Sequence, residues 1–256
     1  MRTLIAIPVF NERKYVDRVL RRVHDFHDQI LCVDDCSTDG TGDLLAQRKD
    51  IHLIRHERNM GYGRSIIDSF DFAAANGFDW IITMDCDEQH EPEMLPTFLR
   101  EIEKDASDII SGSRYTHVNA QDDIAPGDRQ LINRTITAAV NDLFGWELTD
   151  TFCGFKAHRV SAMQKLKLDE PGYAFPLQLW PRVYAAGLTV TEIPVRRIYN
   201  DPNRTFGGTL DDAKIRLRHY LDVLKTELTR INHEGASSVD LITLDEPQAC
   251  CDCSCG

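Results

Sequence analysis

The chain lacks long apolar runs and has fewer basic than acidic residues. No apolar stretch approaches the roughly 20 residues that a membrane-spanning helix needs, and Met1-Arg2-Thr3 leads directly into an apolar strand pattern. We therefore expect no signal peptide, no transmembrane segment and a cytoplasmic location. Lys and Arg number 29 against 41 Asp and Glu, and the resulting net charge of −12 argues against general attraction to nucleic acid or to an anionic membrane.

Complete phosphate-binding loops are also absent. Gly61-Tyr62-Gly63 forms a glycine-bearing turn before a helical pattern, where backbone N–H groups can approach a phosphate. The turn lacks the rest of the dinucleotide fingerprint and the lysine of a Walker loop, so both of those nucleotide-binding classes are excluded.

Disulfides are not expected, although the chain has eight cysteines. Four are scattered through what reads as a reduced cytoplasmic core, namely Cys32, Cys36, Cys86 and Cys153. The other four crowd the C-terminal end and are spaced too tightly for a usual structural zinc site: Cys250, Cys251, Cys253 and Cys255. We expect residues 233–256 to form a flexible Cys-rich tail.

Short apolar strands alternate with amphipathic helices along the chain. The composition, 42% hydrophobic and 27% charged, is that of a soluble globular protein. Strand patterns cover 3–9, 29–34, 51–54, 80–84, 108–112 and 188–195, and helical patterns cover 41–47, 65–75, 92–104, 129–144, 173–186 and 210–231. This order predicts an α/β fold in which a mostly parallel, Rossmann-like sheet is flanked by helices. We expect one domain over residues 1–232, with a mobile loop at 116–127.

Two acids separated by one residue end the strand pattern that begins at Trp80. Residues that alternate faces along a strand would place Asp85 and Asp87 on the same side. Mg²⁺ and Mn²⁺ are typically held by one or two carboxylates and complete their shell with phosphates and water. The pattern therefore predicts a divalent-cation site, with solubility or helix capping as the alternative explanation.

Two further strands end in polar residues of the same kind. Asn11 and Glu12 follow the first strand, and Asp34 and Asp35 end the second. Parallel sheets bind ligands beyond the carboxyl ends of their strands, so all of these acids are expected at one edge.

Six motifs in order resemble the family 2 inverting glycosyltransferases, and in particular the dolichol-phosphate mannose synthase branch. The likeness covers roughly residues 1–200 and is far more specific than any single motif. The motifs occupy residues 7–12, 33–41, 59–63, 84–90, 112–114 and 150–156. The resemblance implies an A-type glycosyltransferase fold and a nucleoside-diphosphate sugar donor, with a nucleotide-sugar half at about 1–112 and an acceptor half at about 113–232.

The resemblance also implies roles for residues at the donor site. Pro8, Phe10 and Glu12 would wall the nucleotide pocket, and Asp35 would accept a hydrogen bond from the base with support from Asp34. The implied metal ligands are Asp85, Asp87 and Gln89, so Asp87 is expected to be essential for turnover with Mg²⁺ or Mn²⁺.

At the acceptor side, Arg114 and Arg129 stand where the lipid-phosphate branch has basic residues near its acceptor phosphate. A helix-surface charge is the alternative for Arg129. A phosphate acceptor needs little help from a base, whereas a hydroxyl acceptor needs a carboxylate to take its proton. Asp150 is the candidate for that base, and a turn-stabilising role is its alternative.

The chain departs from the branch in two respects. Gln178 stands where an acid is usual, and the C-terminal hydrophobic helices of many relatives are absent. A polyprenyl-phosphate acceptor would then be met by a peripheral enzyme at the inner face of the membrane. A local phosphate-binding surface is expected among the later basic residues, although a solvated helix face also explains the last three: Arg196, Arg197, Arg204, Lys214, Arg216 and Arg218.

Three other functions remain open at this point. They are transfer to a soluble hydroxyl acceptor, a sugar nucleotidyltransferase and a non-catalytic nucleotide-sugar binding module. Nucleotidyltransferases usually open with a glycine-rich and basic loop, and residues 8–14 contain no glycine. The presence of all three metal-ligand candidates argues against a purely binding module.

Overall fold

The computed structural model describes residues 1–117, 122–200, 205 and 207–235. Its centre is a seven-stranded sheet in the order β3-β2-β1-β4-β6-β5-β7. The strands are β1 (Thr3–Val9), β2 (Ile30–Asp34), β3 (His52–Arg55), β4 (Trp80–Thr83), β5 (Ile109–Ser113), β6 (Lys156–Arg159) and β7 (Val190–Pro194). All neighbours pair in parallel except β6, which runs antiparallel to both β4 and β5. The mostly parallel α/β sheet predicted from the sequence is confirmed.

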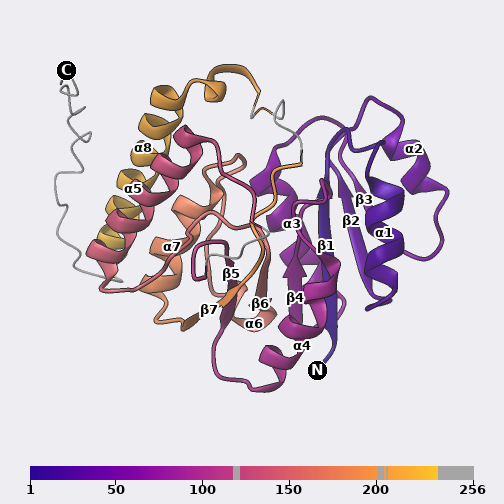
Figure 1. Ribbon diagram of the computed structural model, residues 1–256. Coiled ribbons are helices and arrows are strands. Elements are labelled where there is room, and N and C mark those ends of the chain that lie inside the picture. Colours follow the sequence, from indigo (N-terminus) through magenta and orange to yellow (C-terminus); the bar gives the residue numbers. More distant parts are fainter. Residues whose placement is uncertain (118–121, 201–204, 206, 236–256) are drawn as a thin grey trace.

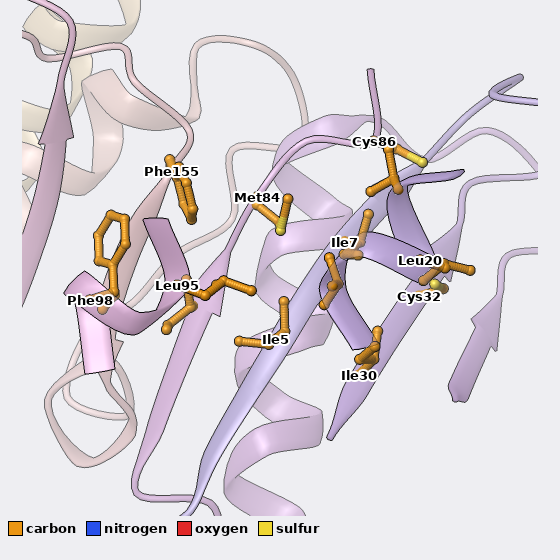
Figure 2. Packing of buried hydrophobic residues seen from close by; sticks show 14 of the residues in the cluster. Ile5, Ile7, Leu20, Ile30, Cys32, Met84, Cys86, Leu95, Phe98 and Phe155 are labelled. Carbon is orange, nitrogen blue, oxygen red and sulfur yellow. The ribbon is translucent and has the colours of Figure 1, made fainter. Parts of the chain in front are cut away.

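The strands read as continuous apolar runs because helices cover both faces of the sheet. Alternate residues of β1 enter different clusters, with Ile5 and Ile7 on one face and Leu4 and Ala6 on the other. The first face is covered by helices α1 (Val16–His24), α2 (Thr41–Ala46) and α4 (Leu95–Glu103), the last preceded by the 3₁₀ turn η1 (Pro92–Met94). Figure 2 shows the β1 isoleucines between residues of α1 and α4.

The second face is covered by α3 (Tyr62–Ala75), α6 (Val160–Met163) and α7 (Phe175–Ala185). A third apolar cluster joins α7 to α5 (Gly127–Phe144) and α8 (Ala213–His233), which follows the 3₁₀ turn η2 (Gly208–Asp211). In Figure 1, α5 and α8 lie on the opposite side of the molecule from α1 and α2. Helices α5 and α8 therefore form a separate layer that packs against α7.

Several element boundaries differ from the prediction. The strand at Trp80 ends at Thr83, so Asp85 and Asp87 lie in a loop and not in a strand. Helix α3 begins at Tyr62 and not at residue 65, and the short helix α6 was not predicted. The loop expected at 116–127 has no helix or strand where it is described before α5 begins at Gly127; residues 118–121 lie outside the described part.

The C-terminal tail cannot be compared with its prediction beyond residue 235, since residues 236–256 lie outside the described part. In the described ranges, every helix is too short or too polar to cross a membrane.

Candidate active site

One cavity of about 410 Å³ opens at the edge of the sheet where β1, β2, β4 and β5 end. Residues from both halves of the chain line it. The first half contributes Pro8, Phe10, Glu12, Asp35, Tyr62, Asp85, Asp87 and Gln89, among others. The second half contributes Arg114, Arg129, Asn133, Phe152, Gly154, Tyr173, Tyr199, Arg216 and Tyr220, among others. The edge predicted to bind a ligand is therefore the one that carries the cavity.

The loop after β4 keeps its two acids on the cavity side, although the strand has ended. Met84 and Cys86 are buried in the core (Figure 2). Asp85 and Asp87 line the cavity, together with Cys86. Asp87 Oδ1 accepts from the backbone N–H of Gln89 at 3.0 Å, which fixes the turn between these two expected metal ligands.

Asp85 is surrounded by groups that orient it. Its backbone N–H donates to Nδ1 of His90 at 2.9 Å, and its carboxylate lies next to the Tyr62 hydroxyl, beside Gly154. Burial lowers the pKa of His90 to about 4, so the imidazole is neutral near pH 7 and its Nδ1 is free to accept. The ring of His90 stacks on Phe155, with centroids 5.0 Å apart.

The donor set at this loop fits a divalent cation that also binds substrate. In residues 1–117, 122–200, 205 and 207–235, no group of three or more His, Cys, Asp and Glu side chains could hold a metal ion. Asp85, Asp87 and Gln89 instead offer two carboxylates and one amide to the same cavity. Mg²⁺ and Mn²⁺ accept such a partial oxygen shell when phosphates and water complete it.

Asp35 lines the cavity beside Pro8, Phe10 and Glu12, the residues expected to hold the nucleotide. Its carboxylate accepts from the backbone N–H groups of Met60 at 2.6 Å and Gly61 at 2.8 Å. A third contact, of 2.6 Å, comes from Nδ1 of His56. An ionised carboxylate has about four acceptor sites, so Asp35 both holds the 59–61 turn and retains capacity for one more donor.

Asp34 does not line the cavity. It is fully buried, its Oδ1 accepts from the backbone N–H of Ser37 at 3.0 Å, and its Oδ2 lies 3.2 Å from Arg55 Nε. Asp34 therefore supports the turn that carries Asp35, in line with the supporting role expected for it.

The second wall of the cavity carries arginines and aromatic rings. Arg129 lies over the ring of Tyr199, at 5.9 Å from its centroid. Arg216, on α8, is buried, pairs with Asp128 and donates to the Leu210 carbonyl at 2.6 Å. Lys214 and Arg218 are exposed, as the prediction of a solvated helix face requires. The prediction is wrong for Arg216, which is buried and lines the cavity.

The rest of the expected basic surface is dispersed. Arg196 pairs with Glu91 at 3.3 Å, and Arg197 Nε donates to the Asp123 carbonyl at 2.7 Å. Arg204 lies outside the described residues.

Asp150, the candidate base, does not reach the cavity wall. Its side chain is fully buried and accepts from Arg114 Nε at 2.6 Å, Arg114 Nη2 at 2.9 Å and Asn133 Nδ2 at 2.7 Å. Burial alone would raise its pKa, but Arg114 and Asn133 lower the pKa to about 2. A carboxylate so placed is a poor proton acceptor, so the base role is corrected to that of orienting Arg114.

Gln178, at the position where the branch usually has an acid, is buried and also absent from the cavity wall. Its Oε1 accepts from the backbone N–H groups of Asp169 and Glu170, both at 2.7 Å. Its Nε2 donates to Asp169 Oδ1 at 2.6 Å and to Glu227 Oε1 at 3.0 Å. The glutamine that replaces the usual acid thus contributes to the packing of α7 against α8 and not to the cavity wall.

Sequence reasoning missed several side chains that complete the cavity. The glycine turn gave a local signal for Tyr62 only. The others lie on helices and loops without a motif of their own: Asn133, Tyr173, Tyr199 and Tyr220.

Comparison with known proteins agrees with this architecture. The sequence model of glycosyl transferase family 2 matches residues 4–167. A polyprenol monophosphomannose synthase from Mycolicibacterium smegmatis is 32% identical over 204 residues, which cover 76% of this chain and 76% of that protein. An undecaprenyl-phosphate mannosyltransferase from Micrococcus luteus is 27% identical over 231 residues, which cover 86% of this chain and 94% of that protein.

Among solved structures, the fold is similar to that of glucosyl-3-phosphoglycerate synthase from Mycobacterium tuberculosis in complex with Mn²⁺, uridine-diphosphate-glucose and phosphoglyceric acid. The TM-score is 0.66 at 18% identity, over 90% of this chain and 80% of the other. The fold is thus the A-type glycosyltransferase fold, and the relatives found by sequence are consistent with the polyprenyl-phosphate branch. The chain belongs to glycosyl transferase family 2 and is a glycosyltransferase.

Proposed function

We propose that this enzyme transfers a hexose from a nucleoside-diphosphate sugar to a polyprenyl phosphate, with inversion at the anomeric carbon and with Mg²⁺ or Mn²⁺ bound at the donor loop. The separation of acidic and basic side chains between the two walls of the cavity supports a phosphate acceptor. The carboxylates of its wall are Glu12, Asp35, Asp85 and Asp87, whereas the described residues beyond 112 contribute Arg114, Arg129 and Arg216 and no acid.

The absence of a carboxylate from the second wall, as far as that wall is described, suits an acceptor that is already ionised. A phosphate monoester carries negative charge near neutral pH and can attack without giving up a proton. Arg114, held in place by Asp150, and Arg129 would orient such a phosphate toward the sugar. A hydroxyl acceptor would need a base, and Asp150 does not supply one.

In the proposed reaction an acceptor phosphate oxygen forms a bond to the anomeric carbon from the face opposite the leaving group. The bond from that carbon to the diphosphate breaks, and the electron pair leaves with the nucleoside diphosphate. A divalent cation held by Asp85, Asp87 and Gln89 would offset the negative charge that develops on the leaving diphosphate. Asp35 and Phe10 would hold the nucleoside at the other end of the cavity.

The names of the sequence relatives, which specify polyprenol and undecaprenyl phosphates, support the lipid acceptor. We further propose that the enzyme is cytoplasmic and meets this acceptor at the membrane surface.

Transfer assays test the proposal directly. The purified protein is incubated with Mn²⁺ and guanosine-, uridine- or thymidine-diphosphate hexoses, and with either polyprenyl phosphate or the matched unphosphorylated polyprenol in detergent. We expect a sugar-linked polyprenyl phosphate by mass spectrometry and no product from the polyprenol. Transfer to the polyprenol, or transfer only to a water-soluble acceptor such as phosphoglyceric acid, would contradict the acceptor assignment. Conversion of the sugar nucleotide and added pyrophosphate into a nucleoside triphosphate and a hexose 1-phosphate would indicate a nucleotidyltransferase.

A further inference from the structure

Tyr62, the first residue of α3, connects the donor carboxylates to the helices of the second half. Its hydroxyl lies next to the Asp85 carboxylate beside Gly154, and its ring stacks on Tyr173 with centroids 5.8 Å apart and planes inclined by 16°. We propose that Tyr62 is a positioning residue that fixes the Asp85 carboxylate for the divalent cation. This inference rests on the metal site of the proposed function.

The backbone of Gly154 lies against Tyr62 and Asp85. A Cβ placed on Gly154 would lie 2.8 Å from the Tyr62 hydroxyl oxygen and 3.1 and 3.2 Å from the two Asp85 carboxylate oxygens. These distances are shorter than ordinary contacts, so any larger residue would displace the pair. Tyr62 and Asp85 are thus confined between the backbone at Gly154 and the ring of Tyr173.

The first turn of α3 is itself held against a segment of the second half. The backbone N–H of Arg64 donates to the Pro171 carbonyl at 3.1 Å. A Cβ placed on Gly61 would lie 2.3 Å from that carbonyl oxygen, and one on Gly63 would lie 2.2 Å from the Glu170 carbonyl oxygen. Both glycines are required because the two backbones are in direct contact.

Gln178 fixes this segment from the interior. Through its contacts with the backbone at Asp169 and Glu170 and with the Glu227 carboxylate on α8, it joins the segment to the α7–α8 interface. The orientation of a donor-side carboxylate is therefore set by packing in the half of the chain that forms the acceptor wall.

A tyrosine suits this position because its ring packs against Tyr173 while its hydroxyl reaches the side of the Asp85 carboxylate. Groups that hydrogen-bond to a metal ligand set the orientation of that ligand, and their removal typically costs 10–100-fold in metal affinity.

The test is Mn²⁺ binding by Tyr62→Phe, which keeps the ring and its stacking and removes only the hydroxyl. The full chain is titrated with Mn²⁺ in the presence of guanosine or uridine diphosphate, whichever binds more tightly, and free Mn²⁺ is followed by electron paramagnetic resonance. We expect about tenfold weaker Mn²⁺ binding and an unchanged unfolding midpoint. Tyr184→Phe, which removes a hydroxyl on α7 away from the cavity lining, is the matched control and should bind Mn²⁺ like the wild type.

Gly154→Ala provides a second, independent variant because it would push against the same two side chains from the opposite side. It should also weaken Mn²⁺ binding. Wild-type Mn²⁺ affinity in both variants would overturn the inference while leaving the metal site intact. Failure of the wild-type protein to bind Mn²⁺ with either nucleotide would overturn the metal part of the proposed function, and this inference with it.

Discussion

The two walls of the cavity are built in different ways. On the donor side, the key groups follow strand ends directly: Phe10 after β1, Asp35 after β2 and Asp85 after β4. On the acceptor side, only Arg114 follows a strand, whereas Arg129 and Arg216 come from helices α5 and α8. The donor wall is therefore encoded in short local motifs, and the acceptor wall depends on how distant helices pack.

The walls also use charge differently. Asp85 and Asp87 face the cavity, so their charges are available to a ligand. On the acceptor side, the buried carboxylates Asp150 and Glu227 pair with Arg114 and Arg182. We expect substitutions of donor carboxylates to change the rate and substitutions of buried acceptor-side charges to change stability first.

The largest effect is expected for Asp150→Ala. Removing the carboxylate leaves the partly buried Arg114 guanidinium without its partner, and breaking a buried pair in this way costs up to about 3–5 kcal/mol. Urea unfolding measures the loss. The double variant Arg114→Ala with Asp150→Ala should lose less than the sum of the two single variants, and strict additivity would contradict a coupled pair.

The same pair predicts acid sensitivity. An unfolded Asp has a pKa of about 3.9, whereas the folded value for Asp150 is lowered to about 2. The stabilisation is therefore complete above about pH 4 and is lost as the pH falls toward 2. Asp150→Asn should show a shallower loss of stability over this range than the wild type, and equal slopes would contradict the shift.

The next effect is expected for Asp87→Ala, on the donor side. We predict at least about 100-fold lower kcat, because a ligand that stabilises the leaving diphosphate is removed. Loss of the hydrogen bond that Asp87 Oδ1 accepts from the Gln89 backbone N–H at 3.0 Å should cost about 1 kcal/mol of stability. Asp28→Ala, at a side chain that is 91% exposed, is the control. Full activity of Asp87→Ala at limiting metal would contradict the mechanism.

A smaller effect is expected for Gln178→Glu, which restores the acid usual in the branch. The new carboxylate would face Asp169 and Glu227, the two groups to which the amide now donates. We predict a loss of about 1–3 kcal/mol of stability, measured by urea unfolding at pH 7 and reduced at pH 4. A gain of stability would mean that the amide is not required by its neighbours.

The smallest effect is expected for Arg129→Ala. Loss of one phosphate contact at a partly exposed position should raise the KM for polyprenyl phosphate about tenfold, or about 1.4 kcal/mol. The KM for the donor sugar nucleotide should not change. An equal rise in both constants would place Arg129 at the donor and would remove the distinction between the walls.

The fold was largely predictable because strands such as β1, β2 and β4 are short, mostly apolar runs that end at turn residues. The residues of β1 alternate between two cores, which explains why it has no polar side chain after Thr3. The antiparallel direction of β6 was not predictable, since Lys156–Arg159 is a four-residue strand with charged residues at both ends. Its buried Lys156 and His158 contradict the usual pattern of a core strand.

The residues of the proposed donor wall could be located at this edge from the sequence because their motifs follow strand ends. Adjacent acids at a strand end point in opposite directions, and of Asp34 and Asp35 only Asp35 lines the cavity. Asp150 and Arg216 could not be interpreted from the sequence, since burial and pairing with Arg114 and Asp128 are properties of tertiary contacts.

The insertion of β6 between β4 and β5 has a consequence for synthesis of the chain on the ribosome. Strands β4 and β5 each have an unpaired edge until residues 156–159 have been synthesised, because β6 pairs with both of them. A nascent chain that has not yet reached residue 156 contains every motif of the proposed donor wall. Its sheet is still divided between β4 and β5. Such an intermediate would be a natural client for chaperones that shield unpaired strands.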